Sequence, residues 1–217
     1  MTKIILLRHG ETEWNKLGKY QGQSDVALSE KGRQQAQALA QHFPVKSVQA
    51  VYSSDLQRAR ETAAIASAPF SCAVQTDPRL REFNFGDWEG LTYAQITERW
   101  PAAMKNFFQH PDILEVPHGE TFQQLQQRAM EAVQEIVSNH EGETVVLAAH
   151  GAVNRTILAA VLHIPLQYIW SMRQDNTAVN ILRHTEGHYI LELMNSTAHL
   201  RSSLESETFF GNSVDKG

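Results

Sequence analysis

The chain has little cysteine and no long apolar run. Among its 217 residues cysteine occurs once, at Cys72, which excludes an internal disulfide and favours a reducing compartment. The apolar run near the N-terminus is too short for the core of a secretory signal, and no other stretch is long enough to span a bilayer. We therefore expect a cytoplasmic protein that does not associate with membranes.

Positive charge is also scarce. The 19 lysines and arginines are outnumbered by 24 aspartates and glutamates, which gives a formal net charge of −5. The basic residues form no run, whereas binding to a nucleic-acid backbone requires clustered positive charge. We expect no nucleic-acid partner, and any positive charge with a function must be local. The hydrophobic fraction of 42% is sufficient for one sizeable core.

Apolar segments typical of buried strands alternate with amphipathic helices through most of the chain, and this order predicts a layered α/β fold. Strands are predicted at 3–7, 48–52, 72–76 and 144–149, with a hairpin at 179–183 and 189–194. Helices are predicted at about 29–43, 56–66, 92–100, 120–139 and 152–162. The spacing does not predict the order of the strands.

The predicted elements belong to a single domain, residues 1–201. Within it, the segment 84–119 is the least regular and the most aromatic part of the chain, and we expect a cap or lid beside the functional site. Residues 202–217 contain few apolar side chains, so a disordered tail is expected there.

Basic side chains follow three of the predicted strands. Two strands end in a histidine followed by a glycine, at His9 and at His150, and Arg8 precedes the first pair. Arg58 lies in or next to the first turn of the helix that follows a third strand, where the helix dipole favours an anion. Ligands of parallel sheets bind beyond the carboxyl ends of the strands. If the three strands are parallel neighbours, these four side chains converge at one end of the sheet.

A phosphoryl dianion suits two arginines and two imidazoles. Electrostatic stabilisation of its oxygens would be the main catalytic contribution, one imidazole could attack phosphorus, and the other could donate to an oxygen as a charged group. A simpler alternative is that Arg58 only forms an ion pair with Glu61 or Asp55 on its own helix or next to it.

The segment Arg8-His9-Gly10-Glu11-Thr12 resembles the signature of the histidine phosphatase superfamily, the phosphoglycerate mutase-like proteins. Further elements follow in the order found in that family: Asn15, Gln21-Gly22, Ser53-Asp55-Arg58, Arg81-Glu82 and His150-Gly151. The resemblance covers roughly residues 1–200. It implies a three-layer α/β/α fold with a mostly parallel central sheet.

The resemblance also implies a role for each matching residue. His9 resembles the phosphorylated nucleophile, and Arg8, Arg58 and His150 resemble the phosphate clamp. Glu82 resembles the proton donor to the leaving alcohol and later the base that activates water.

Other matching positions imply contacts with the phosphate or the substrate: Asn15, Gln21, Gly22 and Gly151. Three other acids could compete with Glu82 for its role: Glu11, Asp87 and Glu89. The implied mechanism uses charges of the chain itself, so we expect neither a metal ion nor another cofactor.

Within the family, the chain is most similar to phosphatases of small metabolites. Residues 85–90 and 119–122 resemble short bacterial phosphatases such as α-ribazole phosphatase, and residues 175–177 with 195–200 resemble metal-independent phosphoserine phosphatases. This predicts a phosphomonoesterase that hydrolyses a small phosphorylated metabolite through a phosphohistidine intermediate.

Three alternatives remain: a phosphoglycerate mutase, a phosphoprotein phosphatase and a non-catalytic module that binds a phosphorylated ligand. A mutase is disfavoured because residues 84–119 contain only Arg99 and Lys105 as basic residues. A homodimer is possible. Four aromatic residues are assigned to packing, with substrate contact as the alternative: Trp88, Trp100, Phe107 and Phe108. The role of His199 stays open.

Overall fold

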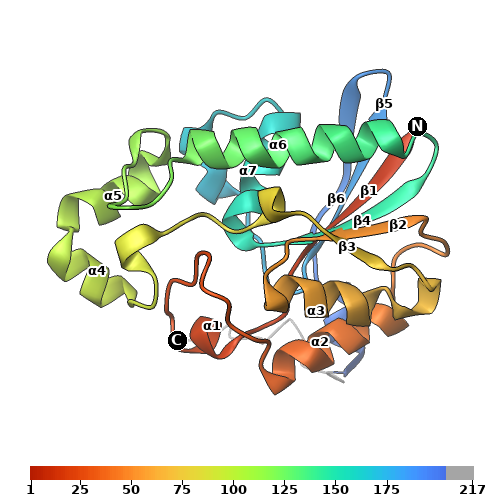
Figure 1. Ribbon diagram of the computed structural model, residues 1–217, viewed down its shortest axis with the longest axis horizontal. Coiled ribbons are helices and arrows are strands. Elements are labelled where there is room, and N and C mark those ends of the chain that lie inside the picture. The colour runs from red at the N-terminus through yellow and green to blue at the C-terminus, as the bar shows by residue number, and fades with distance from the viewer. Residues whose placement is uncertain (204–217) are drawn as a thin grey trace, which may run out of the picture.

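A computed structural model describes residues 1–203 and places a six-stranded sheet at the centre of the protein (Figure 1). The strands are β1 (Thr2–Arg8), β2 (Ala50–Ser53), β3 (Val74–Thr76), β4 (Thr144–Ala149), β5 (Val179–Thr185) and β6 (His188–Ser196). Their order is β3-β2-β4-β1-β5-β6; the first four run parallel, and the β5–β6 hairpin adds two antiparallel strands at one edge. The predicted mostly parallel α/β fold is confirmed.

Seven α-helices and six short 3-10 segments connect the strands within the described residues. The helices are α1 (Glu13–Lys16), α2 (Glu30–Gln41), α3 (Gln57–Ala66), α4 (Tyr93–Arg99), α5 (Pro101–Gln109), α6 (Phe122–Asn139) and α7 (Gly151–Val161). The 3-10 segments are η1 (Ala68–Phe70), η2 (Pro78–Leu80), η3 (Gly86–Trp88), η4 (Pro111–Ile113), η5 (Leu166–Ser171) and η6 (Ala198–Ser203).

The element boundaries follow local capping chemistry. The hydroxyl of Ser29 caps α2 by accepting a hydrogen bond from the amide of Gly32. The short helix α1 lies outside the predicted helices, and Thr12 and Asn15 form a reciprocal capping box there. Pro101 begins α5 directly after α4, at a position where its missing amide proton is not needed.

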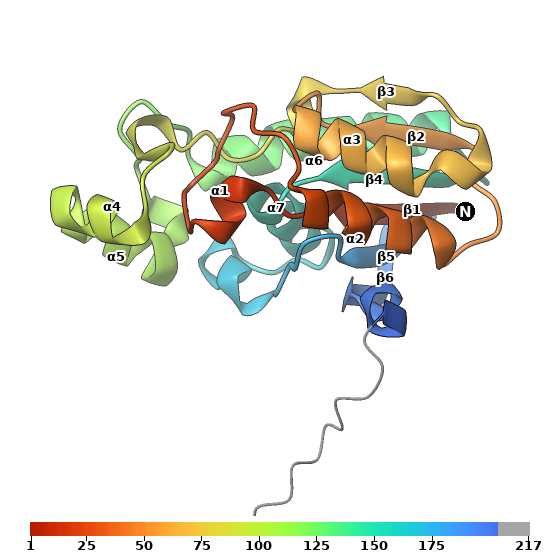
Figure 2. The ribbon, with the colours of Figure 1, turned by 90° about the horizontal axis from the view of Figure 1, so that it is seen from below.

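Helices cover both faces of the sheet (Figures 1 and 2), and an apolar cluster lies on each face. Ile4 and Leu6 of β1 point into a cluster with α6, α7 and the cap, whereas Ile5 and Leu7 point into a second cluster with α2 and α3. The alternation arises because successive strand residues face opposite sides. The central strands β1 and β4 are therefore buried on both faces.

The predicted cap, residues 84–119, extends beyond the carboxyl ends of the parallel strands (Figure 2). Trp88 and Phe107 are buried there in the first apolar cluster, so the structure assigns them to packing; Trp100 is half-buried against that cluster, and Phe108 is exposed. Of the predicted disordered tail, residues 202 and 203 belong to the backbone of η6, and the rest lies outside the described residues.

Candidate active site

The strands that carry the predicted site residues are parallel neighbours, because β4 pairs with β2 on one side and with β1 on the other. Arg8 ends β1, His9 follows it, and His150 follows β4 directly. Arg58 lies in the first turn of α3, after β2. The ring centroids of His9 and His150 are 5.1 Å apart. The sequence-based expectation that these side chains converge at one end of the sheet agrees with this geometry.

His9 is held in one tautomer by a backbone carbonyl. Its Nδ1 lies 2.7 Å from the carbonyl oxygen of Gly10, and since a carbonyl can only accept, Nδ1 carries the proton. The lone pair of the neutral ring is therefore on Nε2. The carbonyl of His9 itself accepts from the amide of Thr177 and from Nδ2 of Asn176, which fixes the backbone at this position. This geometry fixes the orientation of the imidazole and leaves Nε2 free to act as a nucleophile.

Arg58 is buried and Arg8 is half-buried, and neutral carbonyl groups accept the hydrogen bonds of both. Arg8 donates to the carbonyl of Gln174 over 2.5 Å, and Arg58 donates to the carbonyls of Ser24 and Gly22 over 2.8 and 2.6 Å. The Nε atoms of both arginines are buried without a hydrogen-bond acceptor among the described residues. Carbonyl groups orient a guanidinium but do not neutralise its charge, so the site favours an anionic ligand.

The simpler interpretation of Arg58 as a partner in a local ion pair is wrong. Asp55 is bound in bidentate fashion by Arg81, with N–O distances of 2.7 and 2.6 Å, and Glu61 accepts from Arg33. Both carboxylates therefore have other cations as partners, and the Arg58 guanidinium remains directed at the site.

Burial and the arginine charges determine the protonation of the two imidazoles. Burial, followed by the charges of Arg58 and Arg8, holds the pKa of His9 well below its usual value. Burial and then Arg58 also hold the pKa of His150 well below its usual value. Burial lowers the pKa of Arg58 to about 10, so this arginine stays charged at neutral pH. In the free site both imidazoles are neutral, which suits His9 as a nucleophile. The charged form expected for His150 does not agree with its lowered pKa, but the neutral ring still has one N–H to donate.

Glu82 lies at the N-terminus of α7. Its carboxylate accepts from the backbone amides of Ala152 and Val153 over 3.0 to 3.2 Å, and from its neighbour Phe83 over 2.8 Å. Backbone amides at a helix N-terminus are natural partners of a carboxylate. These contacts hold Glu82 against the same helix that begins immediately after His150.

The three competing acids are bound elsewhere. Glu11 forms an ion pair with Lys31, Asp87 interacts with His118, and Glu89 accepts from the backbone of residues 23 and 24. None of the three lines the cavity at the strand ends.

That cavity has a volume of about 190 Å³. It is lined by Arg8, His9, Asn15, Gly18, Lys19, Tyr20, Gln21, Gly22, Arg58, Glu82 and Phe85. Two predicted residues lie behind this wall: His150 is fully buried beside His9, and Gly151 lies between Arg155 and Arg8, since a Cβ at that position would be 3.2 Å from Nη1 of Arg155 and 3.5 Å from Nε of Arg8. All the predicted site residues are thus at or directly behind one cavity.

Several residues of the site carry no signal that sequence reasoning used. Tyr20 and Phe85 line the cavity, and Arg128 holds the backbone of the Glu82 segment by donating to the carbonyls of residues 79, 81 and 82. Arg155 packs near Arg8, and burial lowers its pKa to about 10. The sequence feature that points to Arg155 is that no other lysine, arginine, aspartate or glutamate occurs between positions 149 and 172.

His199 is buried in η6 and does not line the cavity. Its Nε2 lies 3.0 Å from the hydroxyl of Thr177, whose amide in turn binds the carbonyl of His9. It therefore supports the segment behind the nucleophile.

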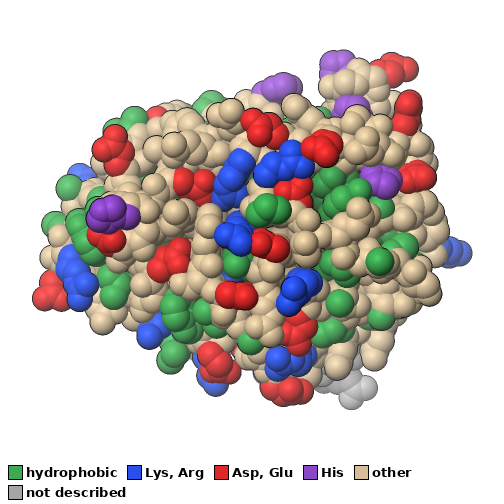
Figure 3. All heavy atoms as spheres, viewed as in Figure 1, with side chains coloured by type: hydrophobic (Ala, Val, Ile, Leu, Met, Phe, Trp, Pro, Cys, Tyr) green, Lys and Arg blue, Asp and Glu red, His purple; other side chains and the backbone are tan. Residues whose placement is uncertain are grey.

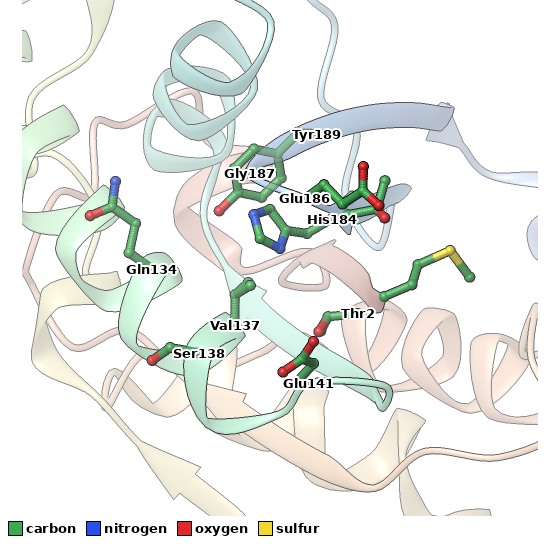
Figure 4. A pocket seen from close by; sticks show the side chains of 11 residues that line it. Thr2, Gln134, Val137, Ser138, Glu141, His184, Glu186, Gly187 and Tyr189 are labelled. Atoms are coloured by element: carbon green, nitrogen blue, oxygen red, sulfur yellow. The ribbon is translucent and has the colours of Figure 1, made fainter.

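A larger hollow, of about 430 Å³, lies at the opposite ends of the strands, between α6 and the β5–β6 hairpin (Figure 4). His184 and Tyr189 form one side of it, and Glu141 and Glu186 add negative charge. No predicted site residue lines it. On the face of the molecule seen in Figure 3, acidic and basic side chains are intermingled.

Across residues 1–203, no three His, Cys, Asp or Glu side chains gather in a way that could hold a metal ion. In the same part of the chain, no helix is both long and apolar enough to cross a membrane.

Comparison with known proteins agrees with this geometry. A metal-independent phosphoserine phosphatase from Arabidopsis thaliana is 37% identical over 209 residues, which cover 93% of this chain and 84% of that protein. The solved structure of Bacillus stearothermophilus YhfR superimposes with a TM-score of 0.89 at 40% identity, covering 92% of this chain and all of that one.

A phosphoserine phosphatase from Entamoeba histolytica, solved in complex with phosphoserine, gives a TM-score of 0.84 at 31% identity and covers 92% of this chain and 100% of that one. The family model of the histidine phosphatase superfamily (branch 1) matches residues 4–197. The predicted resemblance is confirmed, and the chain belongs to the histidine phosphatase superfamily.

Proposed function

We propose that the protein is a phosphomonoesterase that hydrolyses a small phosphorylated metabolite through a phosphohistidine intermediate, without a metal ion. The observation that carries this proposal is the pairing of a neutral His9, protonated on Nδ1, with two arginines that donate to backbone carbonyls and form no ion pair among the described residues. The arginines supply charge for the phosphoryl oxygens, and Nε2 supplies the nucleophile. The phosphatase names of the relatives support the same reaction class.

In the first step Nε2 of His9 attacks phosphorus and the bond from phosphorus to the ester oxygen breaks, while Glu82 gives a proton to the departing alkoxide. In the second step Glu82 takes a proton from water, the water oxygen bonds to phosphorus, and the bond to Nε2 breaks. The products are the alcohol and inorganic phosphate, and His9 is restored. A substrate monoanion can deliver the proton that Glu82 needs, because the second ionisation of a phosphate monoester lies near pH 6.

Replacing Glu82 by Gln tests its role as the acid. Removal of the acid should slow hydrolysis of an alkyl phosphate by about 100-fold and that of p-nitrophenyl phosphate much less, because nitrophenolate leaves without a proton. Steady-state rates for the two esters measure the difference. Equal losses for both would assign another group as the acid.

The cavity of about 190 Å³ is open to solvent, so it holds the phosphoryl group and the adjoining part of the substrate. Beyond the phosphate end, the wall consists of Tyr20, Phe85 and Gln21, with Lys19 as the basic side chain. Phosphoserine is what the Entamoeba histolytica relative binds; the ring-bearing alcohol of α-ribazole 5′-phosphate would have to extend out of the cavity.

Phosphoglycerate mutase is the competing activity. The basic residues of the cap, Arg99 and Lys105, do not line the cavity, so they supply no partner for a second acidic group of the substrate. A homodimer and a cytoplasmic location remain predictions from the sequence.

Phosphate release from a panel of phosphomonoesters, in the presence of a chelator, tests the proposal. The panel contains phosphoserine, α-ribazole 5′-phosphate, 3-phosphoglycerate and several sugar and nucleoside phosphates, with His9→Ala as the control. One substrate with a kcat/KM far above the others, dependent on His9, is the expected result. Interconversion of phosphoglycerate isomers without phosphate release would identify a mutase, and inactivation by chelator that added metal reverses would contradict the metal-free mechanism.

A further inference from the structure

The loop Gly22–Ser24 holds the guanidinium of Arg58 on one side. The carbonyl of Gly22 accepts from Nη2 over 2.6 Å, and the carbonyl of Ser24 accepts from Nη1 over 2.8 Å. Arg58 is fully buried, so these two carbonyls fix where its remaining N–H groups point. The direction of Arg58 therefore depends on the position of this loop.

Glu89 of the cap holds the other side of the same loop. Its carboxylate accepts from the amide of Gln23 over 2.7 Å, from the amide of Ser24 over 2.8 Å and from the hydroxyl of Ser24. Gly22 has a φ of +51°, and a Cβ there would collide with the Glu89 carboxylate. The backbone at this point thus leaves space for Glu89, and only glycine adopts the conformation without strain.

One peptide group joins the two charges. The carbonyl of Gly22 and the amide of Gln23 belong to the same planar trans peptide, so its oxygen and its N–H point in opposite directions. Arg58 binds the oxygen and Glu89 binds the N–H. A cation on the oxygen and an anion on the N–H polarise the peptide in the same sense, and the two hydrogen bonds strengthen each other.

We propose that Glu89 is a positioning residue for catalysis, which acts through the Gly22–Gln23 peptide to hold Arg58 toward the phosphoryl group of the substrate. This inference rests on the proposed function. Glu89 itself does not line the cavity, so it acts on the substrate only through Arg58. Its charge also contributes to keeping Arg58 protonated.

The same contacts connect the cap to the phosphate end of the site. Glu89 follows the 3-10 segment η3 in the cap. The neighbouring backbone pairs with Tyr20, whose carbonyl accepts from the Gly90 amide and whose amide donates to the Leu91 carbonyl. The side chain of Gln23 donates a hydrogen bond from Nε2 to the carbonyl of Glu82 over 3.4 Å. A single loop thus contacts the cap, the clamp arginine and the backbone of the catalytic acid.

A double-mutant cycle between Glu89 and Arg58 tests the proposal. The variants are Glu89→Ala, Glu89→Gln, Arg58→Ala and the double variant E89A/R58A, with Glu98→Gln as a control at an exposed acid of α4. We measure kcat/KM for p-nitrophenyl phosphate, the affinity for inorganic phosphate by calorimetry, and the Tm of each variant. Glu89→Gln keeps an oxygen for the loop amides while removing the charge, and it replaces Glu89→Ala if the latter does not fold.

Glu89→Ala should lower kcat/KM and phosphate affinity by about tenfold or more when Arg58 is present, as for other groups that orient a ligand-binding side chain. In the Arg58→Ala background the same substitution should lower kcat/KM and phosphate affinity by less than about twofold, because the residue through which Glu89 acts is gone. Glu89→Gln should lie between the wild type and Glu89→Ala. Equal losses with and without Arg58 would overturn the proposal and assign Glu89 a general structural role.

The two proposals fail in different ways. If the wild type shows no turnover that depends on His9, the proposed function is wrong, and the cycle on phosphate affinity still decides whether Glu89 acts through Arg58. If turnover depends on His9 but the cycle is additive, only the role of Glu89 is wrong.

Discussion

The two ends of the parallel strands both carry a hollow, and the smaller one is the candidate site. The cavity at the carboxyl ends measures about 190 Å³ and is lined by the buried Arg58, the half-buried Arg8 and the buried imidazole of His9. The hollow at the amino ends measures about 430 Å³ and is lined by no lysine or arginine of the described residues (Figure 4). Volume therefore does not single out the candidate site, whereas arginines that form no ion pair within residues 1–203 do.

Helix direction explains why the two ends differ. The helices α3 and α7 both begin at the carboxyl ends of the strands, so their partly positive N-termini face the cavity. The hollow at the other end is lined by the last turn of α6, where the partial charge is negative, together with Glu141 and Glu186. An anionic substrate is attracted to the first end and repelled from the second.

Among the substitutions that compare the two ends, His9→Ala should cause the largest loss of activity. Loss of the attacking nitrogen should lower kcat by about 10⁴-fold or more and abolish the acid-labile phosphoenzyme. Rapid-quench labelling with a radioactive phosphomonoester measures the intermediate, and the Tm checks the fold. Labelling that persists in this variant would move the nucleophile to another residue.

Arg58→Ala should have the next largest effect, about 100- to 1,000-fold on kcat/KM, because a charge aimed at the transferring group is removed. Arg33→Ala is the matched control, since Arg33 is a partly exposed arginine in an ion pair with Glu61. This control should keep nearly full activity. A comparable loss in both variants would mean that arginine burial does not mark the site.

The pH dependence of stability should report the two buried imidazoles of the candidate site. The pKa values of His9 and His150 are lowered in the folded protein, so the unfolded chain takes up protons first as the pH falls below about 6.5. Above that pH these two groups leave the free energy of unfolding at its full value. As the pH falls toward their pKa values in the folded protein, the free energy of unfolding decreases. Urea unfolding at pH 7 and at pH 5 should show a smaller decrease in the free energy of unfolding for His9→Ala than for the wild type.

If His9→Ala and the wild type lose the same stability between these pH values, His9 is not held neutral by its surroundings.

The smallest effect is expected at the larger hollow. His184→Ala should change kcat/KM for the best substrate by less than about twofold, as for most substitutions on a surface. Steady-state kinetics at several substrate concentrations measure it. A loss of tenfold or more, with an unchanged Tm, would show that the hollow between α6 and the hairpin takes part in the reaction.

By itself the sequence determined the local elements that carry the chemistry. The end of β1 at Arg8, the end of β4 before His150 and the start of α3 beside Arg58 agree with the predicted boundaries to within a few residues. The reason is that a buried strand, a cap and a helix start depend on neighbouring residues. The resemblance to the family then supplied roles for residues such as Glu82, which periodicity alone does not single out.

Only the tertiary structure decided which of these elements are neighbours and what holds the side chains in place. The order β2-β4-β1 brings the ring centroids of His9 and His150 to 5.1 Å from each other. Strand order depends on packing between segments that lie far apart in the chain. Backbone carbonyls of residues 22, 24 and 174 orient the two arginines, and a carbonyl has no sequence signature. For the same reason Glu89 was predicted only as a competing acid, since its link to Arg58 passes through a peptide group that any residue could provide.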